Sequence, residues 1–440
     1  MSASGSDPAY DVAIARLFER QPNRMVPDLE RIRALCDLLG QPQRSYPVIH
    51  VTGTNGKTTT VAMIASLLGA LGLSAGSYTS PHLQDVRERI RVAGEPVDRA
   101  AITSGLAYLQ PFLDTVDESQ PDPVTFFEIL TALAFVHFAD APVDVAVLEV
   151  GMGGRWDATN VAEGQVAVLT DISLDHPELG AHVGAVAGEK SGIIKPGATV
   201  VSAAQPDEAT AVIAQAAEEA GASLVVAGRD FGVVERRTAV GGQHLHLTGV
   251  TGEVTDIYLP LHGLHQAANA AYALVAVEAF LGFAGGIDPD VIREGFAAVR
   301  SPGRLEVVRH GNGAPVILDG AHNPSGARSL AIALANEFAF RHRVFVLGVL
   351  GDKDIEAMVE ELKPVASHVV ATSPSSDRAA PAERLEKVVR AAGISVETAA
   401  SVEEALELAQ GLAHDNDAVV VTGSLYTVGA ARDALGLDPA

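Results

Sequence analysis

The chain of 440 residues contains one cysteine, one tryptophan and no long apolar run. A lone cysteine, Cys36, excludes an internal disulfide and is typical of a protein from a reducing compartment. No apolar stretch approaches the length that a membrane-spanning helix needs. The first residues, MSASGSDPAYD, lack the charged and then apolar pattern of a secretory signal peptide. We therefore expect a cytoplasmic protein that has no membrane partner.

Basic residues are also scarce, because 31 Lys and Arg stand against 55 Asp and Glu, which gives a formal net charge of −24. This excess of negative charge disfavours nucleic acid and anionic membranes as partners. An anionic small substrate would have to be held by a local group of arginines. The acidic composition favours a soluble monomer.

The sequence does contain a regular alternation of short apolar runs and helical segments. In the first part, runs such as VIHVTG, VDVAVLEVG and QVAVLTDI alternate with stretches of helical periodicity, which indicates a mostly parallel sheet with helices on both faces. The alternation restarts after a Pro-Gly break in RSPGRLE, Arg300–Glu306, where we place a domain boundary. We expect a doubly wound α/β domain over 1–302, with a small antiparallel appendage at about 229–260, and a smaller Rossmann-like α/β domain over 303–440.

The stretch VIHVTGTNGKTTT, Val48–Thr60, predicts a strand, a glycine-containing turn and a helix that begins near Lys57. Gly53 and Gly56 permit a tight turn whose backbone N–H groups face an anion, and the helix N-terminus adds partial positive charge. In such a loop Lys57 reaches the β- and γ-phosphates and the Thr58 hydroxyl binds Mg²⁺. The first domain is thus expected to contain a P-loop.

The common form of this loop has a further glycine at the position of Val51. The alternative interpretation is a strand–turn–helix corner that carries a surface lysine. We favour a subclass of the phosphate-binding loop, because two glycines, a lysine and a threonine all fall where phosphate binding needs them.

Polar residues also follow other strands at their C-terminal ends, where open α/β sheets place their sites. Glu149 ends the run VDVAVLEVG, and a buried carboxylate costs free energy unless it is paired or binds a metal. It is either a Mg²⁺ ligand or one half of a structural ion pair, and its place beside the phosphate loop favours the ligand. In the loop that follows, Arg155 and Asp157 face one side, and we expect Trp156 to pack in the interior.

Three other groups leave alternatives open. Arginines at 87, 89 and 91 follow a Ser-Pro-His turn and form either an anion site or a solvated charge run. His176 follows another strand. Because Mg²⁺ generally prefers oxygen ligands, His176 is either an unusual metal ligand or a residue that contacts the ligands from outside. In the second domain, Asp319 and His322 precede a helix start that could face a nucleotide or a carboxylate, although DG and NP are also common turn formers. Arg304 in the linker could reach a phosphate.

Taken together, these motifs resemble one family closely, the folylpolyglutamate synthase/dihydrofolate synthase enzymes of the Mur ligase superfamily. The resemblance covers nearly the whole chain and rests on an ordered set: HVTGTNGKTTT, YTSPHL, RERI, TFFE, EVGMGGRWDATN, EKSGIIKPG, HQAANA, PGRLE, DGAHNP, GDKD and GSLYTVG. It explains the missing glycine, because the ATP loop of that superfamily typically has TGTNGK. The first domain is then expected to be a P-loop-containing ATPase domain.

The resemblance implies ATP-dependent ligation of L-glutamate to dihydropteroate, to a reduced folate (poly)glutamate, or to both. A carboxylate of the pterin compound attacks the γ-phosphate to give an acyl phosphate, and the glutamate amine then displaces phosphate. The implied cofactors are ATP and Mg²⁺ at two sites, with a monovalent cation such as K⁺ as a further candidate.

The resemblance also implies roles for individual residues. It assigns ATP contacts to Gly53, Thr54, Asn55, Gly56, Lys57, Thr58, Asn269, Arg304, Asp319 and His322. It assigns metal ligation to Thr58, Ser80, Glu149 and His176. It assigns catalytic roles to Lys57, His176 and Lys190, the last of which the family carbamylates. It assigns pterin-substrate contacts, as a weaker transfer, to Thr125, Phe127, Arg155, Asp157 and His82.

The sequence argues against two other functions. A peptidoglycan amino-acid ligase of the same superfamily carries an extra domain ahead of the ATP loop, whereas only about fifty residues, enough for two helices, precede the loop here. A P-loop NTPase without ligase chemistry would not need a second doubly wound domain, nor polar groups on successive strand ends.

Overall fold

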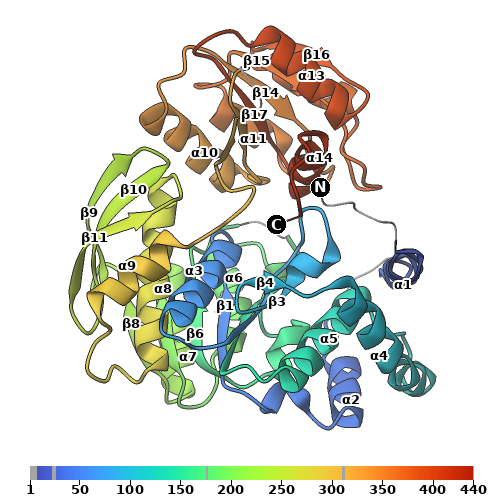
Figure 1. Ribbon diagram of the computed structural model, residues 1–440, viewed down its shortest axis with the longest axis vertical. Helices are drawn as coiled ribbons and strands as arrows, with labels where there is room; N and C mark the ends of the chain where they lie inside the picture. The colour runs from blue at the N-terminus through green and yellow to red at the C-terminus, as the bar shows by residue number, and fades with distance from the viewer. Residues whose placement is uncertain (1–6, 22–25, 175–176, 310–312, 440) are drawn as a thin grey trace.

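A computed structural model describes residues 7–21, 26–174, 177–309 and 313–439. The chain forms a larger N-terminal part and a smaller C-terminal part, each built around its own mostly parallel sheet (Figure 1). A three-stranded antiparallel sheet lies at the side of the larger part and reaches toward the smaller one (Figure 1). The predicted α/β class is confirmed.

Eight strands form the sheet of the N-terminal part, in the order β4-β3-β2-β5-β1-β6-β7-β8. The strands β2, β5, β1, β6, β7 and β8 run parallel, and β3 and β4 are antiparallel additions at one edge. Every residue of β1 and β5 is buried, because helices cover both faces of the sheet. The strands span Val48–Thr52 (β1), Ala75–Tyr78 (β2), Ile90–Val92 (β3), Glu95–Pro96 (β4), Val145–Glu149 (β5), Gly164–Leu169 (β6), Thr199–Ser202 (β7) and Ser223–Val226 (β8).

The helices of this part divide between the two faces of the sheet. On one face, α3, α8 and α9 share an apolar core with Ile49 and Val51 of β1. On the other face, α1, α2, α4 and α5 pack around Val48, while α6 and α7 cover β6 and β7. The helices span Pro8–Phe18 (α1), Glu30–Leu38 (α2), Lys57–Ala70 (α3), Arg99–Ser119 (α4), Phe126–Asp140 (α5), Val183–Lys190 (α6), Asp207–Glu219 (α7), Leu264–Phe280 (α8) and Pro289–Ala297 (α9).

The three-stranded sheet has the order β11-β10-β9 and packs its apolar side on α8 and α9. Its strands span Gly232–Ala239 (β9), Gly242–Thr248 (β10) and Glu253–Leu259 (β11). Short 3₁₀ turns connect other elements of the larger part: Pro42–Arg44, Val86–Arg89, Ala158–Val161, Pro177–Leu179 and Ser191–Ile193.

The C-terminal part has a six-stranded sheet in the order β12-β13-β17-β14-β15-β16, in which only β12 is antiparallel. One apolar core lies between this sheet and α10, α11 and α12, and a second lies between the sheet and α13 and α14. The elements span Glu306–Val308 (β12), Val316–Leu318 (β13), Pro324–Glu337 (α10), Arg343–Leu347 (β14), Ile355–Leu362 (α11), His368–Ala371 (β15), Ala382–Ala391 (α12), Ser395–Thr398 (β16), Val402–Leu412 (α13), Ala418–Thr422 (β17) and Leu425–Ala434 (α14).

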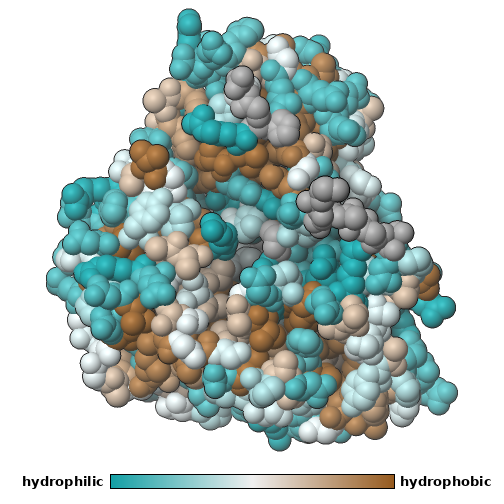
Figure 2. All heavy atoms as spheres, viewed as in Figure 1, coloured by the Kyte–Doolittle hydropathy of each residue, from teal (hydrophilic) through white to brown (hydrophobic). Residues whose placement is uncertain are grey.

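The surface seen in Figure 2 is mostly polar and mixed, with apolar residues gathered across the C-terminal part near its junction with the larger part. Within the described ranges of the chain, no helix has both the length and the apolar character needed to cross a bilayer.

Candidate functional site

The carboxyl ends of the parallel strands in the larger part face the loops that follow β13 in the smaller part. Between them lies a cavity of about 410 Å³, within the range of about 300–1,000 Å³ that small-molecule sites occupy. Its walls come from both parts of the chain and include most of the residues for which we predicted nucleotide or metal contacts: Thr54, Asn55, Gly56, Lys57, Thr58, Ser80, Glu149, Asn269, Arg304, Asp319 and His322. The fold therefore gathers side chains that lie as far apart in sequence as Thr54 and His322.

The turn between β1 and α3 depends on its two glycines. Gly53 and Gly56 have φ values of +150° and +88°. A Cβ on Gly53 would lie 1.8 Å from Thr170 Oγ1, and one on Gly56 would lie 2.5 Å from Asn269 Oδ1. Because no other residue fits at either place, the backbone can bend tightly into the N-terminus of α3. This directs the positive N-terminal end of the helix toward the cavity.

Two lysines converge on this turn. Lys57 Nζ donates hydrogen bonds to the carbonyl oxygens of Gly53, at 3.0 Å, and Thr54, at 3.2 Å. Lys190 is the last residue of α6 and is buried, and its Nζ donates to the same Gly53 oxygen at 2.7 Å. Two lysine ammonium groups beside a helix N-terminus add positive charge at this turn, which suits a polyphosphate.

A buried carboxylate faces the turn from the neighbouring strand. Glu149 ends β5 and is only 1 % exposed. Its Oε1 accepts a hydrogen bond from Thr58 Oγ1 at 2.9 Å, and its Oε2 accepts one from the Ser80 N–H at 3.2 Å. Burial raises the pKa of Glu149, although the charge of Lys57 and the two hydrogen bonds act in the opposite direction.

The predicted metal ligands that the structure describes therefore lie together. The Thr58 hydroxyl contacts the Glu149 carboxylate, Ser80 adjoins that carboxylate through its N–H, and all three residues line the cavity. Hydroxyl and carboxylate oxygens are hard donors that fit Mg²⁺. His176, the remaining predicted ligand, lies outside the described residues. Among residues 7–21, 26–174, 177–309 and 313–439, no three His, Cys, Asp or Glu side chains group as an all-protein metal site, and Mg²⁺ bound to phosphates does not require one.

The smaller part contributes charged and polar groups to the opposite wall. Asp319 follows β13, and its carboxylate accepts hydrogen bonds from the N–H groups of Leu305, at 2.9 Å, and Ala321, at 3.0 Å. It thereby orders the linker that carries Arg304. Burial raises the pKa of Asp319, and the positive charge of Arg304 acts against that rise.

Direct contact between the two parts occurs across the cavity at Asn55. Asn323, the N-cap of α10, donates from its Nδ2 to Asn55 Oδ1 at 3.2 Å. His322, next to it, donates from Nδ1 to the Gly320 carbonyl at 2.8 Å, which holds the ring at the cavity wall. On α8, Asn269 is oriented by its Nδ2, which donates to Gln266 Oε1 at 3.0 Å.

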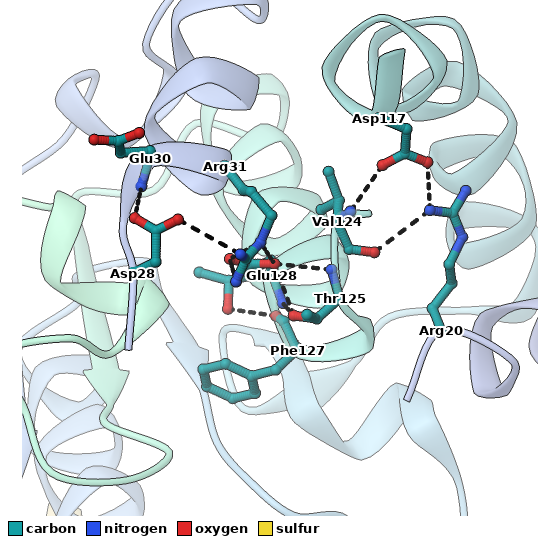
Figure 3. A network of polar contacts seen from close by, with 10 residues as sticks. Arg20, Asp28, Glu30, Arg31, Asp117, Val124, Thr125, Phe127 and Glu128 are labelled. Carbon is teal, nitrogen blue, oxygen red and sulfur yellow. Dashed lines mark hydrogen bonds and ion pairs between the residues drawn. The ribbon is translucent and has the colours of Figure 1, made fainter. Parts of the chain in front are cut away.

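The predicted pterin contacts Thr125 and Phe127 stand at the start of α5, beside a buried network (Figure 3). Thr125 is the N-cap, and its side chain and N–H both pair with Glu128 at 2.8 Å. Arg31 of α2 donates from Nε to both oxygens of Glu128, at 3.2 and 3.1 Å. The ion pair thus fixes the beginning of α5 against α2.

Phe127 and Asp157 meet at Gly151, which itself lines the cavity. A Cβ on Gly151 would lie 2.6 Å from the Phe127 ring and 3.2 Å from Asp157 Oδ2. Arg155, in contrast, points along α6, where its Nη2 donates to the Gly188 carbonyl. Trp156 is 50 % exposed, so the expectation that it packs in the interior is wrong, because its loop runs over the surface.

His82 lies beside the cavity wall and not in it. Its Nδ1 accepts a hydrogen bond from Arg89 Nε at 2.9 Å, and burial together with the charge of Arg89 lowers the pKa of His82 to about 3. The Arg89 guanidinium lies 5.1 Å from the centre of the Phe126 ring. Arg89 is buried, so the alternative that the arginines form a solvated run of charges is wrong for this residue.

Several wall residues were not predicted from the sequence, chiefly Asp171, His265, Gln266 and Tyr272. Burial lowers the pKa of His265 to about 4, which keeps its ring neutral. His265 and Gln266 belong to the same HQAANA stretch as Asn269, so the predicted nucleotide contact of Asn269 could have indicated them. Asp171 follows the C-terminal end of β6, so the strand-end position that indicated Glu149 could have indicated it too, whereas Tyr272 stands in an apolar helical segment with no such signal.

Comparisons with known proteins show the family to which the chain belongs. Residues 51–277 match the family described as "Mur ligase middle domain", and residues 303–425 match "Mur ligase, glutamate ligase domain". The dihydrofolate synthase/folylpolyglutamate synthase of Mycobacterium tuberculosis is 46 % identical over 456 residues, which cover 96 % of this chain and 93 % of that protein.

Solved structures extend the similarity to three dimensions. A structure of Mycobacterium tuberculosis folylpolyglutamate synthase complexed with ADP has a TM-score of 0.94 at 46 % identity, covering 98 % of this chain and 99 % of that one. A structure described as an "FPGS-AMPPCP-folate complex" has a TM-score of 0.86 at 34 % identity and covers 97 % and 99 % of the two chains. The chain therefore belongs to the dihydrofolate synthase/folylpolyglutamate synthase family of the Mur ligases and is an ATP-dependent ligase.

Proposed function

We propose that the protein joins L-glutamate to the carboxyl group of dihydropteroate, of a reduced folate (poly)glutamate, or of both, with ATP as the energy source. The observation that carries this proposal is the convergence on one cavity of the glycine turn, Lys57 and Glu149 with Arg304, Asp319 and His322 of the smaller part. Relatives that cover almost the whole chain bear both synthase names, which supports the two pterin substrates.

In the first step, a carboxylate oxygen of the pterin compound attacks the γ-phosphorus of ATP and ADP departs, leaving an acyl phosphate. In the second, the glutamate amine attacks the acyl carbon, phosphate leaves with the bridging oxygen, and the amine nitrogen loses a proton. Both steps bring anions together, so the site must neutralise charge and hold the reactants in line.

The residues of the glycine turn are suited to that task. The backbone of Gly53–Thr58 would hold the phosphates, Lys57 would neutralise the β- and γ-phosphates, and Arg304 would approach from the smaller part. Mg²⁺ held by Thr58, Ser80 and Glu149 would supply further positive charge to the transferred phosphoryl group. The adenine end would lie by Asn269, with Asp319 and His322 across from it.

Lys190 is proposed to act after carbamylation, which would turn its cation into a carboxylate beside the phosphate turn. Its position 2.7 Å from the Gly53 oxygen supports a role at the phosphates. A second metal site that includes His176, and a K⁺ site, stay predictions. The pterin compound is proposed to lie along Thr125, Phe127 and Asp157, with His82 and Arg155 at the borders of that surface.

The reaction is proposed to run in the cytoplasm by a monomer. The chain has a single, buried cysteine, which agrees with a reducing compartment. A net charge of −24 favours a protein that stays dispersed.

The test is an omission experiment on the purified protein. With ATP, Mg²⁺, L-glutamate and either 7,8-dihydropteroate or tetrahydrofolate, phosphate should appear only when every component is present. Running both pterin compounds separates the two synthase activities. Phosphate release that ignores the pterin compound would instead favour a P-loop NTPase.

A further inference from the structure

The proposed nucleotide cavity is bounded by two helices from different parts of the chain. Helix α8 of the larger part supplies His265, Gln266 and Asn269 to its wall, and the first turns of α10 in the smaller part supply Ser325 and Ser329. The spacing of these helices therefore sets the width of the cavity. What holds them together lies at the far end of α10.

Glu337, the last residue of α10, reaches the beginning of α8. Its carboxylate accepts the Gly263 N–H at 3.1 Å on Oε1 and 3.0 Å on Oε2, and it accepts a hydrogen bond from His262 Nδ1 at 3.3 Å. It also forms an ion pair with Arg236 of β9, and the Glu337 side chain is only 2 % exposed. Figure 1 shows the three-stranded sheet extending toward α10, where this contact forms.

Glu337 is held as an anion. Burial alone would raise its pKa, but the hydrogen bonds from His262 and Gly263 and the charge of Arg236 outweigh burial, so the pKa of Glu337 lies below its ordinary value. A buried carboxylate with three donor groups around it, Arg236, His262 and the Gly263 N–H, is both satisfied and fixed in orientation.

Helix α8 needs an acceptor at this place. Gly263 occupies the N-cap position with φ +102°, and a Cβ there would lie 2.4 Å from the His265 ring, so glycine is required. Glycine has no side chain with which to cap the helix, and within the described part of the chain no side-chain cap is formed at this end of α8. A carboxylate that arrives from the other part of the chain satisfies the Gly263 N–H and lies where the helix dipole favours negative charge.

The contact is braced by the three-stranded sheet. Arg236 donates from Nε to Gln243 of β10, and Gln243 is fully buried. Gln243 Nε2 in turn donates to the carbonyl oxygens of Leu261, at 2.8 Å, and Gly263, at 3.2 Å. The sheet, the segment before α8 and the end of α10 thus form one connected hydrogen-bond network.

We propose that Glu337 is a positioning residue of the ligase, which fixes the N-terminus of α8 to α10 and so holds the two walls of the nucleotide cavity at their working distance. The inference rests on the proposed function, because it assumes that the cavity binds ATP and ADP. Glu337 touches neither reacting atoms nor nucleotide, so its loss acts through the placement of His265, Gln266 and Asn269.

The test compares Glu337→Ala, Glu337→Gln and Arg236→Gln with the unaltered protein. Loss of several hydrogen bonds to a charged group should weaken ADP binding, measured by calorimetry, about tenfold in Glu337→Ala. The ADP affinity of Glu337→Gln should lie between those of Glu337→Ala and the unaltered protein, since the amide oxygen can still accept one N–H. The KM for ATP should rise in step, while the KM for the pterin compound stays within about twofold. Backbone amides at 264–269 should exchange hydrogen for deuterium faster.

The matched control is Arg328→Ala, which removes an exposed side chain of the same helix α10 together with its ion pair to Glu361 of α11. It should leave ADP affinity and amide exchange unchanged. Unchanged ADP affinity and unchanged exchange at 264–269 in Glu337→Ala would overturn the inference.

If Glu337→Ala does not fold, Glu337→Gln and Arg236→Gln replace it. Both should weaken ADP binding and speed exchange at 264–269, and no change in either measurement would overturn the inference. If the unaltered protein binds no ADP, the proposed function fails, and the exchange measurement alone then tests the docking of α8 on α10. Slower or equal exchange in the variants would refute that docking role.

Discussion

Replacing Arg31 by methionine should destabilise the N-terminal part strongly. Arg31 and Glu128 are both only 6 % exposed at their side chains, and the guanidinium contacts both carboxylate oxygens at 3.1–3.2 Å. Without Arg31, the Glu128 carboxylate stays buried with only the two hydrogen bonds from Thr125 (Figure 3). Breaking a buried pair in this way costs about 3–5 kcal/mol, because one charge is left uncompensated.

The assay is urea unfolding followed by tryptophan fluorescence. Trp156 is the single tryptophan of the chain and lies in the same part as the ion pair, so the signal reports on that part alone. The double variant Arg31→Met with Glu128→Gln should recover a large share of the loss, because no uncompensated charge remains. In Arg31→Met the binding of the pterin compound should weaken too, because Glu128, the partner of Thr125, is no longer held in place by Arg31.

The control is Arg237→Ala, which removes an exposed pair with Glu235 on β9, in the part of the chain that contains Trp156. It should change the free energy of unfolding by less than about 0.5 kcal/mol. A loss below about 1 kcal/mol in Arg31→Met, or a double variant less stable than Arg31→Met alone, would refute the reasoning.

Three further predictions concern the cavity and its support. Lys190→Ala should lower the ligation rate at least about 100-fold while ADP binding persists, because Lys57 still donates to the Gly53 oxygen; full turnover would contradict it. Glu149→Gln should raise the Mg²⁺ concentration needed for half-maximal rate at least about tenfold, and an unchanged Mg²⁺ titration would exclude Glu149 as a ligand. Burial and the charge of Lys195 lower the pKa of His50 to about 3 from an ordinary 6.5, so the unfolded chain takes up the proton first and stability falls as pH drops below 6.5. Between pH 7 and 5 this costs about 2 kcal/mol, and His50→Gln should reduce the loss over that interval by this amount in urea unfolding. Equal losses would show that His50 does not titrate on unfolding.

Much of the fold followed from local patterns. Buried parallel strands require continuous apolar runs, so β1 and β5 were visible in the sequence, and the turn at Gly53–Thr58 needs residue types that few other structures require together. Residues at strand ends, such as Glu149 and Asp319, were predicted because parallel strands bring their carboxyl ends to one edge. The boundary at 302/303 stays a prediction.

Contacts between distant segments could not be predicted in this way. Arg89 sits in a run of charges that looks solvated, yet it is buried because His82 and Phe126 meet it in space. Nothing local to Glu337 indicates that it caps a helix that begins at Leu264, and nothing near Arg31 points to Glu128. Such pairs depend on how whole elements dock, which a periodicity does not encode.

The central claim, that this site activates a carboxyl group as an acyl phosphate, can be tested by tracing one oxygen atom. Dihydropteroate or tetrahydrofolate labelled with oxygen-18 in the carboxyl group that accepts glutamate would be supplied with ATP, Mg²⁺ and L-glutamate, and the released phosphate examined by phosphorus NMR. We predict that each phosphate carries one labelled oxygen, because the bridging oxygen of the acyl phosphate originates in the carboxylate. Amide formation accompanied by unlabelled phosphate would contradict the account.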